Sequence, residues 1–150
     1  MRISEKLAER GIELPPVATP VAAYVPAVRA GGYIYTSGQL PVVNGELTAT
    51  GIVGDTVSPE EAAEAARIAA LNALAAAAGE AGGVDNLARI VKVTVFVASV
   101  PDFTGQPAVA NGASTVLSEI FGTPHARSAV GVASLPLGVP VEIELIAEIA

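Results

Sequence analysis

Cysteine and tryptophan are both missing from this 150-residue chain, and aromatic residues make up only 4% of it. Without cysteine the chain can form no disulfide, no thiolate metal site and no cysteine nucleophile. A core with so few rings must be built from Ala, Val, Ile and Leu, whose small side chains let backbones pack closely. Hydrophobic residues account for 51% of the sequence, which argues against disorder and predicts one domain over residues 1–150.

Positive charge is also scarce, since eight Lys and Arg residues stand against 15 Asp and Glu, for a net charge of -7. The cations are scattered singly, whereas binding to a phosphate backbone requires clusters of them. The composition therefore argues against nucleic acid as a partner and predicts that an anionic ligand is small. No apolar run approaches the ~20 residues of a membrane span, and the charged start MRISEKLAERG does not resemble a signal peptide. We expect a cytoplasmic protein with no membrane partner.

The first 20 residues predict an N-terminal helical arm and a rigid lead-in. Residues 3–10 have a helical composition, Gly11 is placed to end the helix, and the following ELPPVATP is rich in proline. Two β-rich runs, residues 22–28 and 33–37, then flank an Ala-Gly-Gly segment, a pattern typical of a hairpin.

Ser58-Pro59-Glu60-Glu61 is the clearest helix start in the chain. The serine suits the N-cap, the proline suits the first helical position, and the glutamate three residues after the serine completes a capping box. The helix is expected to run to about Ala78 and to be ended by residues 79–83. Because it is rich in alanine, it can lie unusually near a sheet.

The rest of the chain predicts a strand, a helix and two further strands. Residues 90–97 alternate Val with Lys, Thr and Phe, which is the period of a strand with two different faces. Residues 108–121 place their apolar side chains on one side of a helical wheel. The last two strands, residues 127–133 and 139–149, are separated by Leu-Pro-Leu-Gly and are expected to form a hairpin.

These elements predict an α+β fold with a single mixed sheet and two helices packed on one face. A sheet covered on one side presents its other face to water or to a partner. Strands as apolar as these indicate a partner, and we therefore expect a homo-oligomer.

Three blocks of the sequence resemble the RidA/YjgF family of reactive-intermediate deaminases. They are YIYTSGQLP (residues 33–41), IVKVTVFVASVPDF (residues 90–103) and the run from ARS through LP to EIE (residues 126–144). The resemblance implies a chorismate-mutase-like subunit, a homotrimer and ligand clefts between subunits. It also implies hydrolysis of 2-imino acids to 2-keto acids and ammonia, with no metal or organic cofactor.

Arg127 matches the arginine that binds the ligand carboxylate in this family. A guanidinium offers a planar fork of donors that fits a carboxylate, and it keeps its charge at any working pH. Arg127 also stands at the start of an otherwise apolar strand, where a solvated charge has little reason to be. The alternative is a strand-end arginine that pairs with a surface carboxylate.

Four further positions match functional residues of the family pattern, namely Tyr24, Ser37, Asn111 and Glu142. Glu142 would hold the attacking water or relay its proton, and Tyr24 would donate to the leaving nitrogen or to the carboxylate. Ser37, by its hydroxyl or backbone, would anchor the other carboxylate oxygen, and the neighbouring Gly38 suggests a close backbone approach.

Each of these positions also has a structural alternative. Glu142 can lie on a solvated strand face, and Tyr24 can cap an interface. The Ser37 hydroxyl can satisfy the bend before Gly38, and Asn111 can be a helix N-cap.

The only histidine, His125, shares the strand side of Arg127 if the strand starts early. A lone histidine cannot form a metal site, and its functional alternative is an accessory proton donor. Gly131 stands where better-known deaminases of the family often carry Glu, and Ala129 where some carry Cys. These departures indicate a divergent branch.

Three functions follow from this interpretation of the sequence. The first is an imine deaminase that binds a small carboxylate. The second is a non-catalytic carboxylate-binding or regulatory trimer, which Gly131 favours slightly. The third is a ribonuclease, which the acidic composition disfavours.

Overall fold

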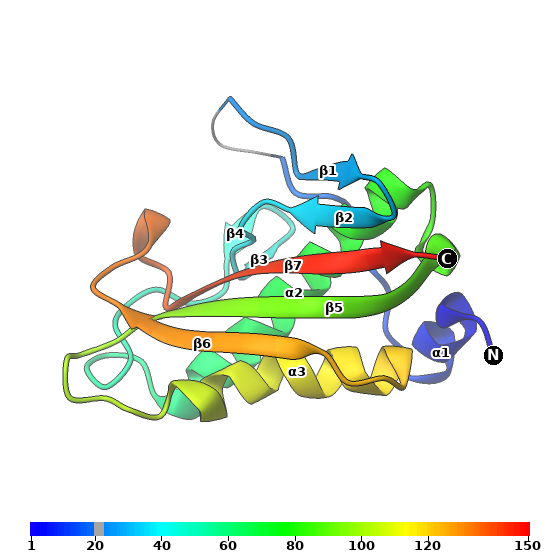
Figure 1. The fold of residues 1–150 in the computed structure, drawn as a ribbon. Helices are drawn as coiled ribbons and strands as arrows, with labels where there is room; N and C mark the ends of the chain where they lie inside the picture. The colour runs from blue at the N-terminus through cyan, green and yellow to red at the C-terminus, as the bar shows by residue number, and fades with distance from the viewer. Residues whose placement is uncertain (20–22) are drawn as a thin grey trace.

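The computed structural model describes residues 1–19 and 23–150. Its helices are α1 (Ile3–Glu9), α2 (Pro59–Ala81) and α3 (Gln106–Phe121), with short 3-10 turns η1 (Val84–Asn86) and η2 (Pro136–Gly138). Its strands are β1 (Ala27–Ala30), β2 (Tyr33–Thr36), β3 (Val42–Val43), β4 (Glu46–Leu47), β5 (Leu87–Ala98), β6 (Ala126–Val132) and β7 (Val141–Ile149). Five of the strands form one sheet in the order β1-β2-β7-β5-β6, and α2 and α3 lie on the same face of it (Figure 1).

The predicted α+β fold, with a mixed sheet and two helices on one face, is confirmed, and β3 and β4 add a separate two-stranded sheet. The predicted hairpin between the last two strands is wrong, because β5 lies between β6 and β7. β5 runs parallel to β6 and antiparallel to β7. The connection that contains η2 therefore crosses the end of β5, which a turn-like local sequence does not reveal.

The first hairpin is present, but its first strand begins later than predicted. β1 starts at Ala27, and Pro26 directly before it has no N–H to donate to a strand partner. Of the predicted run 22–28, residue 22 lies outside the described residues. Residues 23–25 precede the strand and are exposed.

Helix α2 begins with the predicted capping box. Ser58 Oγ accepts the backbone N–H of Glu61 at 3.1 Å, and Glu61 Oε1 accepts the backbone N–H of Ser58 at 3.2 Å. The helix ends within the predicted segment 79–83, because Gly82 caps it in a left-handed conformation, but it runs to Ala81, three residues beyond the predicted Ala78. The glycine at position 79 serves packing, because a Cβ there would lie 3.1 Å from Val17 of the N-terminal arm.

Small residues let the two long helices touch. Alanines and leucines bury most of α2 against the sheet on one side and α3 on the other. A Cβ built on Gly112 of α3 would lie 1.9 Å from the backbone oxygen of Ala63 of α2, so the two backbones are close at this point. The core is therefore dense without large rings.

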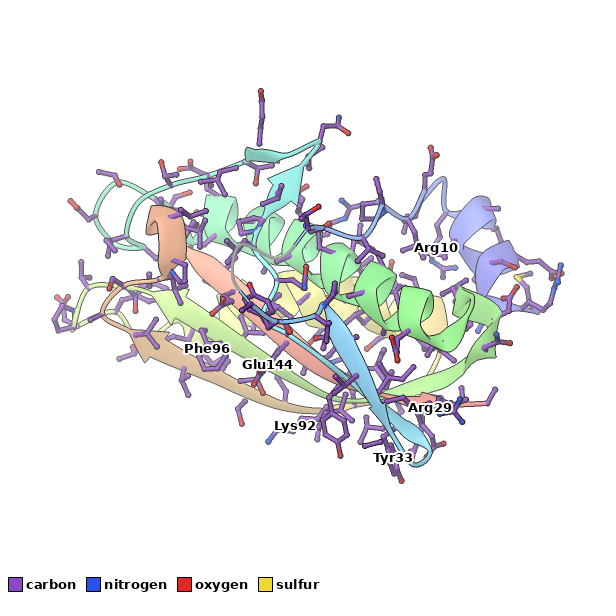
Figure 2. All side chains as sticks on the ribbon, turned by 90° about the horizontal axis from the view of Figure 1, so that it is seen from above. Arg10, Arg29, Tyr33, Lys92, Phe96 and Glu144 are labelled. Atoms are coloured by element: carbon purple, nitrogen blue, oxygen red, sulfur yellow. The ribbon has the colours of Figure 1, made fainter. Side chains whose placement is uncertain are left out.

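β5 alternates as predicted over most of its length. Val93, Val95 and Val97 are buried beneath the helices, and Lys92 and Phe96 extend from the other face (Figure 2). Val91 does not follow the pattern and is only half-buried, because the pairing with β7 shifts register between Ile90 and Lys92.

The face of the sheet turned away from the helices has no cover within the described subunit. Its apolar side chains include Val28, Tyr33, Tyr35, Phe96, Val130 and Ile146. In residues 1–19 and 23–150, no helix combines the length and the apolar character needed to cross a membrane.

Candidate functional site

Arg127 lies on the edge strand β6 and points towards α3. It stands opposite Val93 in the parallel β5–β6 pair, and since Val93 is buried beneath the helices, Arg127 emerges on the helix side of the sheet. Its Nη1 donates to Asn111 Oδ1 at 2.7 Å and to Ser114 Oγ at 3.2 Å. Both partners are neutral, and no ion pair between Arg127 and a carboxylate is formed within the described residues.

The two partners of Arg127 come from one face of α3. Asn111 lies inside the helix, which begins at Gln106 after Gly105, so the N-cap alternative for Asn111 is wrong. Ser114 follows three residues later, at a spacing that brings both side chains to the same side. Ser114 was not among the predicted site residues, although a polar pair at this spacing in an alanine- and valine-rich helix is a usable signal.

His125 joins this group through Ser114. Its Nε2 lies 2.9 Å from Ser114 Oγ, on the same side of the strand as Arg127. Burial, and after it the charge of Arg127, lower the pKa of His125, which favours the neutral ring. We call Asn111, Ser114, His125 and Arg127 the arginine cluster. No cluster of metal-ligating side chains occurs in the part of the chain that the structure describes.

Glu142 lies on the opposite face of the sheet. It stands opposite Phe96 in the β5–β7 pair and is half-buried. Burial, and after it the neighbouring Glu144, raise the pKa of its carboxyl group. Its carboxylate rests against Gly38, since a Cβ built there would lie 2.8 Å from Glu142 Cδ. The close backbone approach predicted at Gly38 is therefore present.

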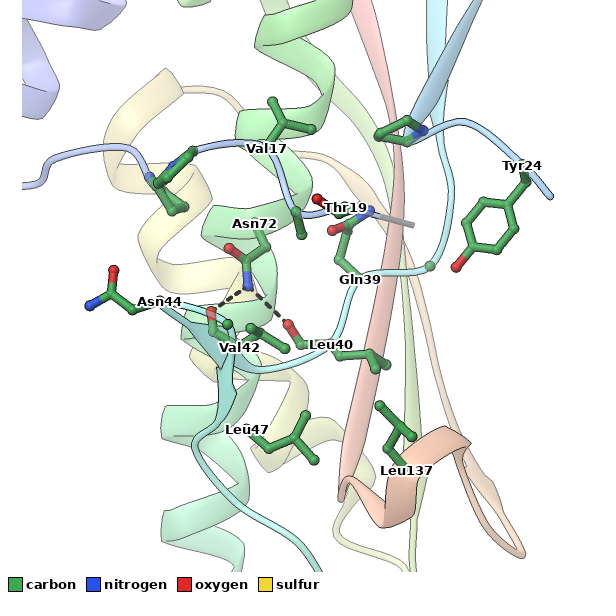
Figure 3. A pocket seen from close by; sticks show the side chains of 16 residues that line it. Val17, Thr19, Tyr24, Gln39, Leu40, Val42, Asn44, Leu47, Asn72 and Leu137 are labelled. Carbon is green, nitrogen blue, oxygen red and sulfur yellow. Dashed lines mark hydrogen bonds between the residues drawn. The ribbon is translucent and has the colours of Figure 1, made fainter. Parts of the chain in front are cut away.

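Gly38 also lines a mostly apolar pocket of about 460 Å³. The pocket lies between the N-terminal arm, the segment after β2 and η2, with Tyr24, Leu40 and Leu137 among its walls (Figure 3). Its volume falls within the range of small-molecule sites. Tyr24 is 46% exposed.

A buried asparagine on α2 holds one wall of this pocket in place. Asn72 Nδ2 donates to the backbone oxygens of Leu40 and Val42, both at 2.9 Å. The sequence interpretation did not single out Asn72. It is the one uncharged polar side chain in the helix, and this was the available signal.

The donors of Ser37 are used within the chain. Its hydroxyl donates to the backbone oxygen of Val25, and its N–H donates to Pro26 O at 2.8 Å. The structural alternative expected the hydroxyl to satisfy the bend before Gly38, whereas it bonds to the segment that precedes β1. Its role as a carboxylate anchor stays a prediction.

Gly131 lies on the same strand as Arg127, and the space beside it is filled by the side chain of Gln106. A Cβ at Gly131 would lie 2.8 Å from Gln106 Nε2, and that nitrogen donates to the backbone oxygen of Phe103 at 2.7 Å. The divergence at residue 131 is thus accompanied by a glutamine that fills the same region.

The amino-acid sequence matches the model of a known protein family. A family model described as endoribonuclease L-PSP matches residues 16–149, which is most of the chain.

Curated relatives also cover most of the chain. Protein TCP17 of Trypanosoma cruzi is 40% identical, over 99% of this chain and 94% of its own. The 2-iminobutanoate/2-iminopropanoate deaminase of Dermatophagoides farinae is 34% identical, over 92% and 94% of the two chains. The mitochondrial protein mmf1 of Schizosaccharomyces pombe is 38% identical, over 88% of this chain and 72% of its own.

Solved structures agree with these relatives. Atu1372 of Agrobacterium tumefaciens, a protein of unknown function, is 43% identical with a TM-score of 0.86, over 98% of this chain and 91% of its own. TdcF of E. coli, solved with bound serine, is 31% identical with a TM-score of 0.65, over 90% and 93% of the two chains. The chain therefore belongs to the endoribonuclease L-PSP family, which is the RidA/YjgF family that its sequence blocks resemble.

Proposed function

We propose that this protein hydrolyses short 2-imino acids to 2-keto acids and ammonia, with the ligand carboxylate held by Arg127. The supporting observation is the guanidinium itself. Only Nη1 is engaged in the contacts of the described residues, so Nε and Nη2 can offer a bidentate grip to a carboxylate. The relatedness to a 2-iminobutanoate/2-iminopropanoate deaminase and to TdcF, which binds serine, supports this ligand class.

The site would be completed between subunits of a homotrimer. Arg127 and Glu142 lie on opposite faces of one sheet, so one subunit does not offer both to a small molecule. A second subunit packed on the uncovered apolar face would bring its own Glu142 or Arg127 to the first. We propose the homotrimer on this ground. The cytoplasmic location is also a proposal, and one relative, mmf1, is named as a mitochondrial protein.

The reaction would depend more on how the imine and the water are positioned than on a large acceleration of the chemical step. Arg127 would hold the carboxylate so that the imine carbon faces a water bound to Glu142. Water adds to that carbon and gives a proton to Glu142, which passes it to the nitrogen, so that a carbinolamine forms. Glu142 then takes the hydroxyl proton as the keto group forms, the C–N bond breaks, and the nitrogen leaves as ammonia after receiving a second proton from Glu142, or from Tyr24, which regains its proton from Glu142. The raised pKa of Glu142 makes its carboxyl a better proton acceptor than an ordinary glutamate.

The alternative is a trimer that binds a keto or imino acid without turnover. The observation that favours it is Gln106, which occupies the region where better-known deaminases often carry a glutamate. Ribonuclease activity, suggested by the family's description, is less compatible with a net charge of -7.

The test is to generate 2-iminobutanoate in solution and to follow keto-acid release with the wild type and Arg127→Ala. Arg29→Ala is the matched control, because Arg29 is an exposed arginine on the opposite edge strand. We expect acceleration over buffer, a loss of roughly ten- to a hundredfold in kcat/KM for Arg127→Ala, and no loss for Arg29→Ala. Binding of 2-oxobutanoate without acceleration would favour the binding trimer. RNA cleavage that survives Arg127→Ala would favour the ribonuclease.

A further inference from the structure

We propose that His125, acting through the hydroxyl of Ser114, positions Arg127 for its ligand. His125 is then a positioning residue, since it reaches the ligand only through Arg127. The proposal rests on the proposed role of Arg127 in binding a carboxylate. It assigns a function to the only histidine in the chain.

The geometry defines a continuous chain of hydrogen bonds. Ser114 Oγ lies 3.2 Å from Arg127 Nη1 and 2.9 Å from His125 Nε2. A guanidinium nitrogen can only donate, so the serine oxygen must accept from Arg127. The single serine proton is then free to be donated to Nε2 of His125, which accepts it when the ring is neutral and carries its proton on Nδ1.

The neutral ring is the favoured form in this position. His125 is half-buried, and burial together with the charge of Arg127 lowers its pKa. In the neutral tautomer that carries its proton on Nδ1, Nε2 accepts from Ser114, and the hydrogen bonds run from arginine to serine to histidine.

These hydrogen bonds determine which donors Arg127 keeps for a ligand. Nη1 carries two hydrogens, and Asn111 and Ser114 accept one each. Three N–H groups remain, on Nε and Nη2, and all three lie in the plane of the guanidinium. Because Nη1 is held at two points, that plane cannot rotate freely. A carboxylate thus meets a fork that is already oriented, which reduces the entropy lost on binding.

The fold explains why the three side chains meet. Arg127 and His125 are two residues apart, so they share one side of the chain as it enters β6. α3 covers that side and presents Ser114 one turn after Asn111. The histidine is placed where the chain enters the strand, next to the arginine that needs support.

The test measures 2-oxobutanoate binding by calorimetry and keto-acid release from 2-iminobutanoate in full-length variants. We expect Ser114→Ala and His125→Leu each to weaken binding roughly two- to tenfold and to raise KM with little change in kcat. The double variant should bind no more weakly than either single variant, because both remove the same support. His125→Gln should restore binding, since its amide oxygen can take the place of Nε2 as acceptor.

The outcomes separate this inference from the proposed function. Wild-type binding in both Ser114→Ala and His125→Leu, with binding lost in Arg127→Ala, would overturn the positioning role and leave the proposed function intact. Fully additive losses, or no rescue by His125→Gln, would overturn it as well. If Arg127→Ala itself binds 2-oxobutanoate like the wild type, the proposed function fails. Should His125→Leu not fold, Ser114→Ala and His125→Gln still decide the matter.

Discussion

Arg127 and Glu142 lie on opposite faces of the same sheet, one strand to either side of β5. Arg127 stands opposite Val93, beneath the helices, whereas Glu142 stands opposite Phe96, on the uncovered face. The carboxylate carbon and the imine carbon of a 2-imino acid are directly bonded. A single subunit therefore cannot apply both side chains to one ligand molecule.

This separation predicts complementation between two inactive variants. Arg127→Ala and Glu142→Gln subunits are each expected to form inactive oligomers, but a mixed oligomer contains some sites with both native side chains. If each site takes one side chain from each of two neighbours, random mixing in equal amounts restores roughly a quarter of all sites, and about a third of the sites in the mixed trimers that copurify with both tags. The measurement is keto-acid release after co-expression and copurification with two different tags. Copurified oligomers with no activity would contradict a shared site.

Gly38→Ala is expected to reduce activity with little effect on stability. The new methyl group would lie 2.8 Å from Glu142 Cδ, at the flexible end of a side chain that can move aside. The displaced carboxylate would hold its water out of place, and we expect a loss of about tenfold or more in kcat/KM. Gly32→Ala is the control, because a Cβ there meets no atom within 4 Å. A large drop in melting temperature in Gly38→Ala would show that the contact is structural instead.

Glu142→Gln is expected to be more stable than the wild type near pH 7. Burial, then Glu144, raises the pKa of Glu142, so the folded state binds this proton more tightly than the unfolded chain does. The proton on Glu142 therefore stabilises the folded wild type only at low pH, and this stabilisation is lost as the pH rises through the folded-state pKa. The neutral glutamine carries no such cost, so the difference should shrink on acidification.

Thermal unfolding at several pH values measures this difference. Glu46→Gln serves as the control, because Glu46 is exposed on β4, which pairs with β3 in a separate two-stranded sheet. A wild type that is more stable than Glu142→Gln at neutral pH would contradict the expected sign.

Gly112→Ala is expected to destabilise the fold. Its Cβ would lie 1.9 Å from the backbone oxygen of Ala63, and a backbone oxygen in a helix cannot rotate away as a side chain can. The two helices must separate, at a cost of about 1–3 kcal/mol in the free energy of unfolding. Urea unfolding, with Gly32→Ala as the control, tests this. Equal unfolding midpoints for the two variants would indicate that α2 and α3 can move apart freely.

Features set by neighbouring residues were predictable from the sequence. The capping box at Ser58 and the alternation of β5 depend on contacts within a few residues, and both are present. Pairing of the last two strands depends on what lies between them. The Leu-Pro-Leu-Gly segment looks like a turn whether or not β5 intervenes, and so the predicted hairpin was wrong.

The candidate site was predictable to the same limited extent. Motif matching identified Arg127 and Asn111 as separate residues, and the structure places them in hydrogen-bond contact. Ser114 and Asn72 matched no motif, because their importance comes from contacts with segments distant in sequence. The bulge that displaces Val91 has a similar origin in the pairing with β7.

Because the chain has few aromatic residues, its intrinsic fluorescence comes from a few known positions. With no tryptophan, ultraviolet emission comes from three tyrosines, and each of these is at least 40% exposed. Tyr33 and Tyr35 stand on the uncovered face of the sheet, and Tyr24 stands at the pocket. Intrinsic fluorescence would therefore follow events at these surfaces, with little signal from the interior.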